Sequence, residues 1–382
     1  MDRAMELELI DELLQLKVSN AAFLDAAVAR NPMRAYVSPE RFDLEQKKLF
    51  RQMPNAAAHI AELPKAGSFV RKDIGGLSTL ITRDKLGGVY AFLNVCRHRG
   101  TRLVDEDAGC KHRFSCPYHA WTYANTGELI GAPHFEEGFP GVDKADLSLQ
   151  RLHCAERFGF VWVWTTDSPI SDIDQWFDGM APDLAGLGMA EMDIAAEDTV
   201  RRQANWKILV EGGIEAYHFR VVHRATIGPH FEDNLSSYRS FGPHMRAVLP
   251  RTSMTSLSEK GRDTWRLRDH ANVLYTLFPS SQLLVMQDHI VWIRSEPISA
   301  GETKMRLVTL APTTGPYAEN KDAAHWKRNH EITMMTLDED FEIGESIQAG
   351  HDSGANEHML FGRFEGALGQ FNRTVAHFIG DH

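Results

Sequence analysis

The sequence predicts an α+β protein, in which a compact all-β domain is followed by a larger domain of antiparallel strands with surrounding helices. Three observations predict this class. Short β-rich runs separated by Gly and Asp turns fill residues 68–163, and a second group of strand-like runs fills 245–312. A long stretch with helical spacing of apolar residues follows at about 323–349. We place the domain limits at 1–40 (an N-terminal helical segment that joins the second domain), 41–165 and 166–382.

The chain is expected to open with helices. Apolar residues recur at roughly helical spacing in residues 1–31, which predicts one or two helices there. Pro32 interrupts this pattern. Ser38 followed by Pro39 is typical of a helix start, and this helix is expected to run through Phe50.

The strands of the all-β domain are short runs rich in β-branched and aromatic residues. Its expected strands include 68–72, 77–81 and 89–95, with 157–164 (RFGFVWVW) as a closing strand. In the second domain, 165–200 is predicted to be linker and helix, and 205–223 a helix that Gly212 and Gly213 weaken and bend. Two further strands are expected at 282–296 and 303–311, and a last helix near Gly362.

Composition excludes several classes of partner. The formal net charge is −11, with 52 acidic and 41 basic residues, so a basic face for nucleic acid or anionic membrane is not expected. No window approaches the ~20 apolar residues of a membrane span, and the N-terminus has no secretory signal pattern. Only four cysteines occur, too few for a disulfide framework. We expect a cytoplasmic protein whose cysteines bind metal or lie buried.

Two short motifs indicate a metal site. Cys96 and His98 form C-x-H, and Cys116 and His119 form C-x-x-H seventeen residues later. Zinc pairs are usually C-x2–4-C and H-x3–5-H, whereas here each motif carries one cysteine and one histidine. That mixed pairing suits a Rieske [2Fe–2S] cluster, in which one iron takes two Cys and the other takes two His. A Cys2His2 zinc site, or four unrelated buried residues, are the alternatives.

A second group of candidate ligands lies in 205–223. Glu215 and His218 are three residues apart and share a helix face. His218 and His223 are five apart, about 140° around an ideal helix, so they can bind one ion only if the helix ends or bulges between them. Two histidines and one carboxylate form the facial triad of non-haem Fe(II) oxygenases.

The segments CRHRG (96–100) and CPYHAW (116–121) resemble the Rieske domain of ring-hydroxylating oxygenases. The resemblance covers roughly residues 40–382 and identifies the chain as similar to the catalytic α subunit of the Rieske non-haem iron oxygenases. It implies an all-β Rieske [2Fe–2S] domain and a helix-grip type catalytic domain, with Cys96, His98, Cys116 and His119 as cluster ligands.

The same resemblance implies the second centre, a mononuclear Fe(II). Residues 215–223 are similar to the family pattern D/E-x2-H-x4-H, with His218 and His223 as iron ligands and Glu215 as a carboxylate that bridges to a Rieske histidine of the neighbouring subunit. The segment 336–348 (TLDEDFEIGESIQ) resembles E-D-x4-E-x2-Q, with Asp340 as the third ligand. Neighbouring acids at 338, 339 and 342 compete for that role.

The implied activity is that of an oxygenase component, which uses O2 and electrons from an NAD(P)H-dependent reductase, with or without a ferredoxin. Electron transfer between subunits implies a homotrimer, and a β subunit stays open. We expect mono- or dioxygenation of a small, aromatic substrate, as in aromatic hydrocarbon catabolism. The alternatives are N-demethylation or oxidation of a quaternary amine of the choline, carnitine or betaine kind, which Glu215 favours. A Rieske electron carrier without oxygenase activity, or a zinc-stabilised binding module, are readings from other classes.

Overall fold

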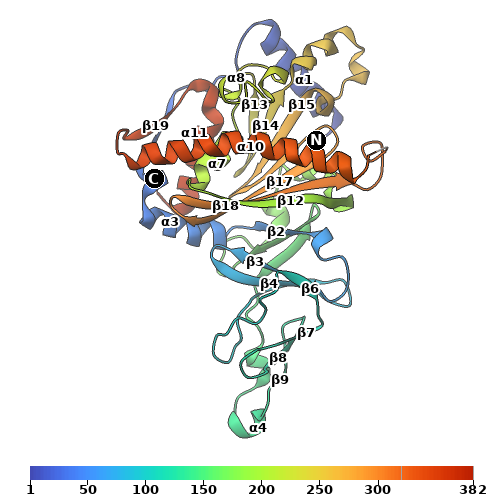
Figure 1. Ribbon diagram of the computed structural model, residues 1–382, viewed down its shortest axis with the longest axis vertical. Helices are drawn as coiled ribbons and strands as arrows, with labels where there is room; N and C mark the ends of the chain where they lie inside the picture. The colour runs from blue at the N-terminus through green and yellow to red at the C-terminus, as the bar shows by residue number, and fades with distance from the viewer. Residues whose placement is uncertain (320, 382) are drawn as a thin grey trace. The chain divides into compact units, whose positions relative to one another are not determined.

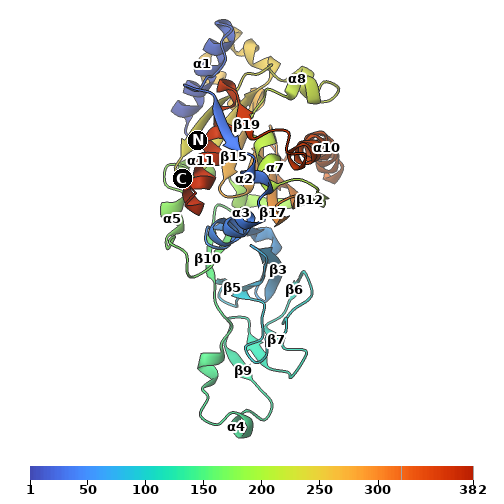
Figure 2. The ribbon, with the colours of Figure 1, turned by 90° about the vertical axis from the view of Figure 1, so that its left-hand side faces the viewer.

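The computed structural model describes residues 1–319 and 321–381 (Figures 1 and 2). It contains two compact units: Phe50–Ile173, and Met1–Leu49 together with Asp174–His382. The predicted α+β class is confirmed. The domain limits expected from the sequence, 41–165 and 166–382, remain predictions. None of the described helices is long and apolar enough to cross a membrane.

The unit Phe50–Ile173 is built from small antiparallel sheets. Its four-stranded sheet has the order β5-β4-β3-β6, and two three-stranded sheets have the orders β10-β11-β2 and β7-β8-β9. The predicted closing strand at 157–164 is confirmed for Phe160–Trp164, which form β11, whereas its first residues lie at the end of β10 and in the turn of the β10–β11 hairpin. Phe158 and Gly159 have positive φ and form that turn. The strands are β2 (Asn55–His59), β3 (Ser68–Ile74), β4 (Leu77–Arg83), β5 (Val89–Leu93), β6 (Ala108–Cys110), β7 (Arg113–Ser115), β8 (Thr122–Ala124), β9 (Leu129–Gly131), β10 (His153–Arg157) and β11 (Phe160–Trp164).

The larger unit is centred on a seven-stranded antiparallel sheet with the order β12-β18-β17-β16-β15-β14-β13. The central strands β17 and β18 are mostly buried and rich in apolar residues, whereas β12 at the edge is mostly polar and partly exposed. That polarity explains why the prediction of linker and helix for 165–200 was wrong where β12 begins. The strands are β12 (Met192–Arg202), β13 (Ser237–Phe241), β14 (His244–Pro250), β15 (Ala271–Leu277), β16 (Ser281–Val285), β17 (Ile290–Ser299) and β18 (Glu302–Pro312).

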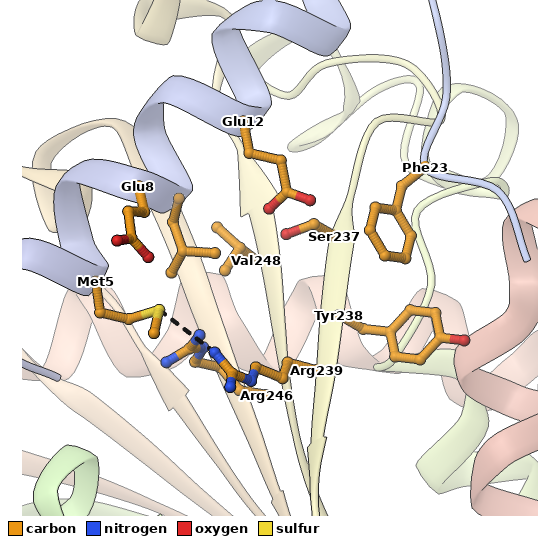
Figure 3. A pocket seen from close by; sticks show the side chains of 10 residues that line it. Met5, Glu8, Glu12, Phe23, Ser237, Tyr238, Arg239, Arg246 and Val248 are labelled. Carbon is orange, nitrogen blue, oxygen red and sulfur yellow. Dashed lines mark hydrogen bonds between the residues drawn. The ribbon is translucent and has the colours of Figure 1, made fainter.

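The N-terminal segment contains a single long helix, α1 (Arg3–Val18). Helix α1 faces β13 and β14 across a pocket of about 380 Å³, into which Glu12 of the helix and Ser237 and Arg246 of the strands point (Figure 3). Residues 29–31 fall within the predicted helical stretch 1–31, but together with Pro32 they form strand β1 (Ala29–Pro32), which pairs with β19 (His358–Phe361). Pairing with a strand more than 300 residues away cannot be predicted from local periodicity.

Helix α10 (Ala323–Asp352) crosses the large sheet and packs against helix α7 (Trp206–Gly212) (Figure 1). The two helices approach closely at Gly344, where an added Cβ would lie 3.0 Å from Leu209 Cδ2. Side chains of α10 also fix the residues before α7: Gln348 Oε1 accepts from the Asn205 amide at 2.9 Å. These contacts set the position of α10 relative to the segment that follows α7.

A buried ion pair joins α7 to helix α3 (Pro39–Glu45), whose start at Ser38 and Pro39 is as predicted. Lys207 Nζ donates to both oxygens of Glu45 at 2.7 and 2.8 Å, and both side chains are almost fully buried. Trp206 Nε1 and Arg41 Nε also donate to Glu45, at 2.8 and 3.2 Å. Glu45 thus carries the only carboxylate in contact with Lys207 within the described part of the chain.

We expect Glu45→Gln to lower the free energy of unfolding by about 3–5 kcal/mol, because a buried cation loses its charged partner. Chemical denaturation of the purified protein measures this change. Glu331→Gln is the matched control, since Glu331 and Lys327 of α10 form a solvent-exposed pair. The control should change stability by less than about 0.5 kcal/mol. Equal effects of the two substitutions would show that burial of the Glu45 pair contributes nothing.

Candidate metal centres

The four predicted cluster residues lie on two loops of the unit Phe50–Ile173. Cys96 and His98 lie between β5 and β6, and Cys116 and His119 lie between β7 and β8. The two loops share one backbone pattern. The Cys96 N–H donates to Thr101 O at 2.8 Å, and the Cys96 carbonyl oxygen accepts from the Gly100 N–H at 3.0 Å. Cys116 makes the same two bonds with Trp121 O and the Ala120 N–H, at 2.8 and 3.0 Å. Gly100 and Ala120, the matching residues, both have positive φ.

The loops bring like ligands together. His98 Nδ1 and His119 Nδ1 lie 3.2 Å apart, and both imidazoles are partly exposed. The Cys96 and Cys116 thiols are buried and interact with each other, and burial raises the pKa of the Cys96 thiol. The site thus has a buried sulfur pair and an outer nitrogen pair.

This division bears on the choice between a zinc ion and a two-iron cluster. Ligand atoms of one tetrahedral zinc lie within about 4 Å of one another, given bonds of 2.0–2.3 Å. Among residues 1–319 and 321–381, one group of three or more His, Cys, Asp or Glu has all its ligand atoms within 4.8 Å, and it is not this one. Two sulfurs on one side and two nitrogens on the other instead match the ligands of two irons.

Two aromatic side chains support the loops, and sequence reasoning missed both. Tyr123 Oη accepts from the Arg97 amide at 2.9 Å and lies 3.5 Å from Cys96 Sγ. With its acceptor position used by the amide, the phenol can donate its proton to the sulfur. Trp121 stacks on the ring of His98, with centroids 4.8 Å apart. Hydrogen bonds to the sulfurs tune such a cluster, and Tyr123 is placed to make one.

The segment predicted as one helix, 205–223, is broken. Helix α7 ends at Gly212, and the short helix α8 (Phe219–Val222) begins after an interruption. His218 precedes α8, and His223 follows it with non-helical backbone angles (φ −92°, ψ 21°). This break meets the condition stated above for two histidines five residues apart to face one point.

The second group of ligands converges there. His218 Nε2 and His223 Nε2 lie 3.2 Å apart, and Asp340 Oδ1 of α10 lies 3.2 and 3.0 Å from them. These three residues are the one group in the described chain whose ligand atoms all lie within 4.8 Å. Two imidazoles and a carboxylate are the donor set of a facial-triad Fe(II) site. The three donors therefore form a candidate His/His/Asp mononuclear iron site.

Each histidine has a carboxylate on its other ring nitrogen. His218 Nδ1 pairs with Glu215, and His223 Nδ1 lies 2.7 Å from Glu339 Oε2. Thr226 Oγ1 donates to the same Glu339 oxygen at 2.7 Å. Such contacts fix the ring orientation and leave Nε2 free to bind a metal. Glu339 was predicted as the first residue of the family pattern and as a competing acid, and no supporting role was assigned to it.

The acids favour a positive charge between them. Burial alone would lower the pKa of His218, but hydrogen bonds and charges of Asp340 and Glu215 outweigh it and raise the pKa to about 10. Burial would raise the pKa of Asp340, yet hydrogen bonds from His218 and His223 hold it below its usual value. The cluster of side chains is thus suited to a bound cation.

A cavity of about 70 Å³ opens beside His223 and Asp340. Its walls are mostly apolar and include the rings of Phe219, Phe231 and Phe341. Gln282 supplies a polar wall and donates to Val210 O at 3.1 Å. The candidate iron site therefore faces a small, aromatic-lined space within the larger unit.

Comparison with known families shows to which family the chain belongs. Residues 53–151 match the family described as "Rieske [2Fe-2S] domain", and residues 189–381 match "Ring hydroxylating alpha subunit (catalytic domain)". The chain belongs to the Rieske non-haem iron oxygenases. It is an α subunit that combines the Rieske domain with the ring-hydroxylating type of catalytic domain, as its sequence motifs indicated.

Several curated relatives resemble this oxygenase. The glycine betaine monooxygenase oxygenase subunit of Chromohalobacter salexigens is 28% identical over 87% of this chain and 81% of its own length. The Pseudomonas aeruginosa protein of the same name is 26% identical over 85% and 82%. The carnitine monooxygenase oxygenase subunit of Escherichia coli K12 is 33% identical over 53% of each chain. A crystal structure of the quaternary ammonium Rieske monooxygenase CntA shares the fold, with a TM-score of 0.78, 22% identity and coverage of 92% and 96%.

Glu339→Gln tests the support of His223. The amide keeps the shape of the side chain but removes the charge on the oxygen that meets His223 Nδ1 and Thr226. We expect iron affinity or turnover to fall about 10- to 100-fold. Iron titration of the metal-free protein followed by a turnover assay measures both. Glu342→Gln, three residues further along α10, is the control. An equal loss of iron affinity or turnover in both variants would contradict a specific role of Glu339.

Proposed function

We propose that this oxygenase oxidises a small quaternary ammonium compound at a carbon bonded to the nitrogen. Two observations support the proposal: relatives that act on glycine betaine and carnitine match the chain over half or more of its length, and aromatic rings line the cavity beside the candidate iron site. Aromatic faces attract quaternary ammonium groups. We therefore propose a quaternary ammonium substrate in place of the aromatic substrate, and of the role in aromatic hydrocarbon catabolism, expected from the sequence.

The reaction takes one oxygen atom into the substrate. A C–H bond next to the nitrogen becomes C–OH, and the other oxygen atom leaves as water, with two electrons and two protons consumed. The resulting carbinol breaks its C–N bond and gives an aldehyde, a tertiary amine and one proton. Loss of a methyl group by this route releases formaldehyde.

The residues present fit both metal groups. Cys96, His98, Cys116 and His119 would hold a [2Fe–2S] cluster, and His218, His223 and Asp340 a mononuclear Fe(II). Held there, the cluster would supply single electrons and the Fe(II) would supply the activation of O2. The chain itself orients His218 and His223 through Glu215 and Glu339 and surrounds the reacting carbon with apolar side chains that exclude water.

Electrons would come from a partner reductase, and the proposed assembly is a homotrimer in which Glu215 bridges to a Rieske histidine of the next subunit. Exposed apolar side chains flank each centre in its own unit. Val95 and Tyr118 lie beside the cluster loops, and Tyr217 and Val221 lie beside His218; Val221 is 71% exposed. Large exposed apolar side chains grouped near polar sites are typical of protein interfaces.

The observation that carries the proposal is the triangle of His218, His223 and Asp340 at the end of an aromatic-lined cavity. The test supplies iron-replete enzyme with a reductase, O2 and two sets of compounds: trimethylammonium compounds and simple arenes. Release of an aldehyde and a tertiary amine, coupled to O2 uptake, is the expected result. Ring hydroxylation of an arene without amine oxidation would overturn the substrate class but retain the oxygenase.

A further inference from the structure

We propose that Arg251 binds a carboxylate at the end of the substrate that points away from the iron site. This inference deepens the function proposed above, because it adds an anionic group to the substrate class. Arg251 follows β14 and lines a second cavity of about 380 Å³. Three features support this role: the second cavity adjoins the one beside the candidate iron site, its lining is more polar, and Arg251 has unused hydrogen-bonding capacity.

The second cavity adjoins the one beside the candidate iron site. The two cavities share six of their lining residues: Ile227, Phe231, Asn272, Leu284, Thr336 and Leu337. Together they provide a path from Asp340 to Arg251 within the larger unit. A molecule with one end near His223 and Asp340 therefore extends toward Arg251 if it is long enough to pass the shared walls.

Polarity changes along this path. Three phenyl rings face the inner cavity, whereas the outer cavity is also lined by His230, Thr252, Ser253 and Thr333. Arg251 is the one lysine or arginine among the lining residues of either cavity. The arrangement matches a molecule with an apolar or diffuse-charge group at the inner end and a compact negative charge at the outer end.

The guanidinium of Arg251 has unused hydrogen-bonding capacity. It donates from Nη2 to Asn272 Oδ1 at 2.8 Å, whereas its buried Nε has no partner in the described residues. No carboxylate of the described chain lies within ion-pair distance, although Asp269 and Asp288 act on it from further away. Asp288 is engaged by Lys321, His289 and His325.

Arg251 is partly buried, and a partly buried guanidinium without a charged partner loses hydration that an anion from outside would compensate. The face of Phe231 also lies against the guanidinium, with the ring centroid 5.8 Å from Cζ. This contact limits the guanidinium to a narrow range of orientations, and Asn272 fixes one edge. With Nη2 bonded to Asn272 and Nε buried, Nη1 is the group placed to donate to a carboxylate oxygen.

The test measures binding to the anaerobic holoenzyme by titration calorimetry. The probes are trimethylammonium carboxylates with one to four methylenes and the matching neutral amides, and benzoate with benzamide. Wild-type enzyme should bind the best carboxylate about 10- to 100-fold more tightly than its amide. Arg251→Gln should remove most of that ratio, and Arg251→Lys should retain part of it. Arg201→Gln, which changes an exposed arginine of β12 outside both cavities, should leave it unchanged.

The ratio is internal to each variant, so a loss of stability does not mimic the result. If Arg251→Gln fails to fold, the ratios of carboxylate to amide affinity in the wild-type enzyme and in Arg251→Lys test the role of Arg251. Equal affinity of acids and amides in the wild-type enzyme would overturn the inference and leave the quaternary ammonium function intact. Preference for benzoate over benzamide, lost in Arg251→Gln, with no binding of any trimethylammonium compound would support the role of Arg251 and overturn the proposed function.

Discussion

Replacing Asp340 with asparagine is expected to abolish turnover, by at least about 1000-fold, while the iron–sulfur cluster stays intact. Within the described part of the chain, Asp340 is the one carboxylate that meets both His218 Nε2 and His223 Nε2, at 3.2 and 3.0 Å. Changes in residues that only orient metal ligands cost 10- to 100-fold, so loss of a ligand itself should cost more. Asparagine keeps the volume of the side chain, which limits the effect on packing between α10 and the sheet.

Two measurements separate this effect from general damage. Metal analysis should fall from about three irons per chain to about two, and the EPR signal of the reduced cluster should be unchanged. Asp338→Asn is the control on the same helix, because Asp338 is half-exposed and pairs with Arg202. If Asp340→Asn keeps its third iron and its activity while the control loses both, the ligand assignment is wrong.

The cluster site was the part most accessible to sequence reasoning. All four residues fall within 24 positions, and the spacing within each loop reflects local backbone geometry. A short segment of sequence is therefore enough to predict the ligand set. The turns at Gly100 and Ala120, both with positive φ, are likewise local features of the two loops. By contrast, the support from Tyr123 and Trp121 depends on which way rings point after the loops fold, and no spacing rule specifies that.

The candidate iron site was harder to predict because its three residues come from two segments more than 100 residues apart. Spacing identified His218 and His223 only on the condition that their helix breaks, and the structure meets that condition around α8. The choice of Asp340 among several acids depended on a family pattern, since a charge run is usually a solvated helix face. The helix packing that brings Asp340 to the histidines is long-range, and it is fixed by contacts such as Gly344 with Leu209.

Arg251 shows the remaining limit. Nothing in its local sequence distinguishes it from other arginines after a strand. Its significance comes from two cavities that share walls and from the absence of an acid within ion-pair distance in the described chain. The edge strand β12 and the pair β1–β19 were missed for a related reason: pairing with distant strands outweighed weak local preferences.

Glu215→Gln is expected to lower turnover about 100-fold through two separable effects. One oxygen of Glu215 meets His218 Nδ1, and the other accepts from the backbone amides of Tyr217 and His218. A glutamine has one acceptor and one donor, so either its NH2 group faces backbone N–H groups or it faces His218 Nδ1. The second arrangement requires the imidazole proton on Nε2, where the metal would bind. Iron affinity should therefore fall about 10- to 100-fold.

The second effect concerns electron delivery and appears only after iron has been restored by excess Fe(II). If Glu215 also bridges to a Rieske histidine of a neighbouring subunit, oxidation of the reduced cluster in a single turnover should be slower in iron-replete Glu215→Gln than in wild type. Glu215→Asp keeps the charge and should recover much of the rate. Stopped-flow absorbance of the cluster measures this step directly. An unchanged rate in the iron-replete glutamine variant would restrict Glu215 to orienting His218 and would leave the path between the two centres to other residues.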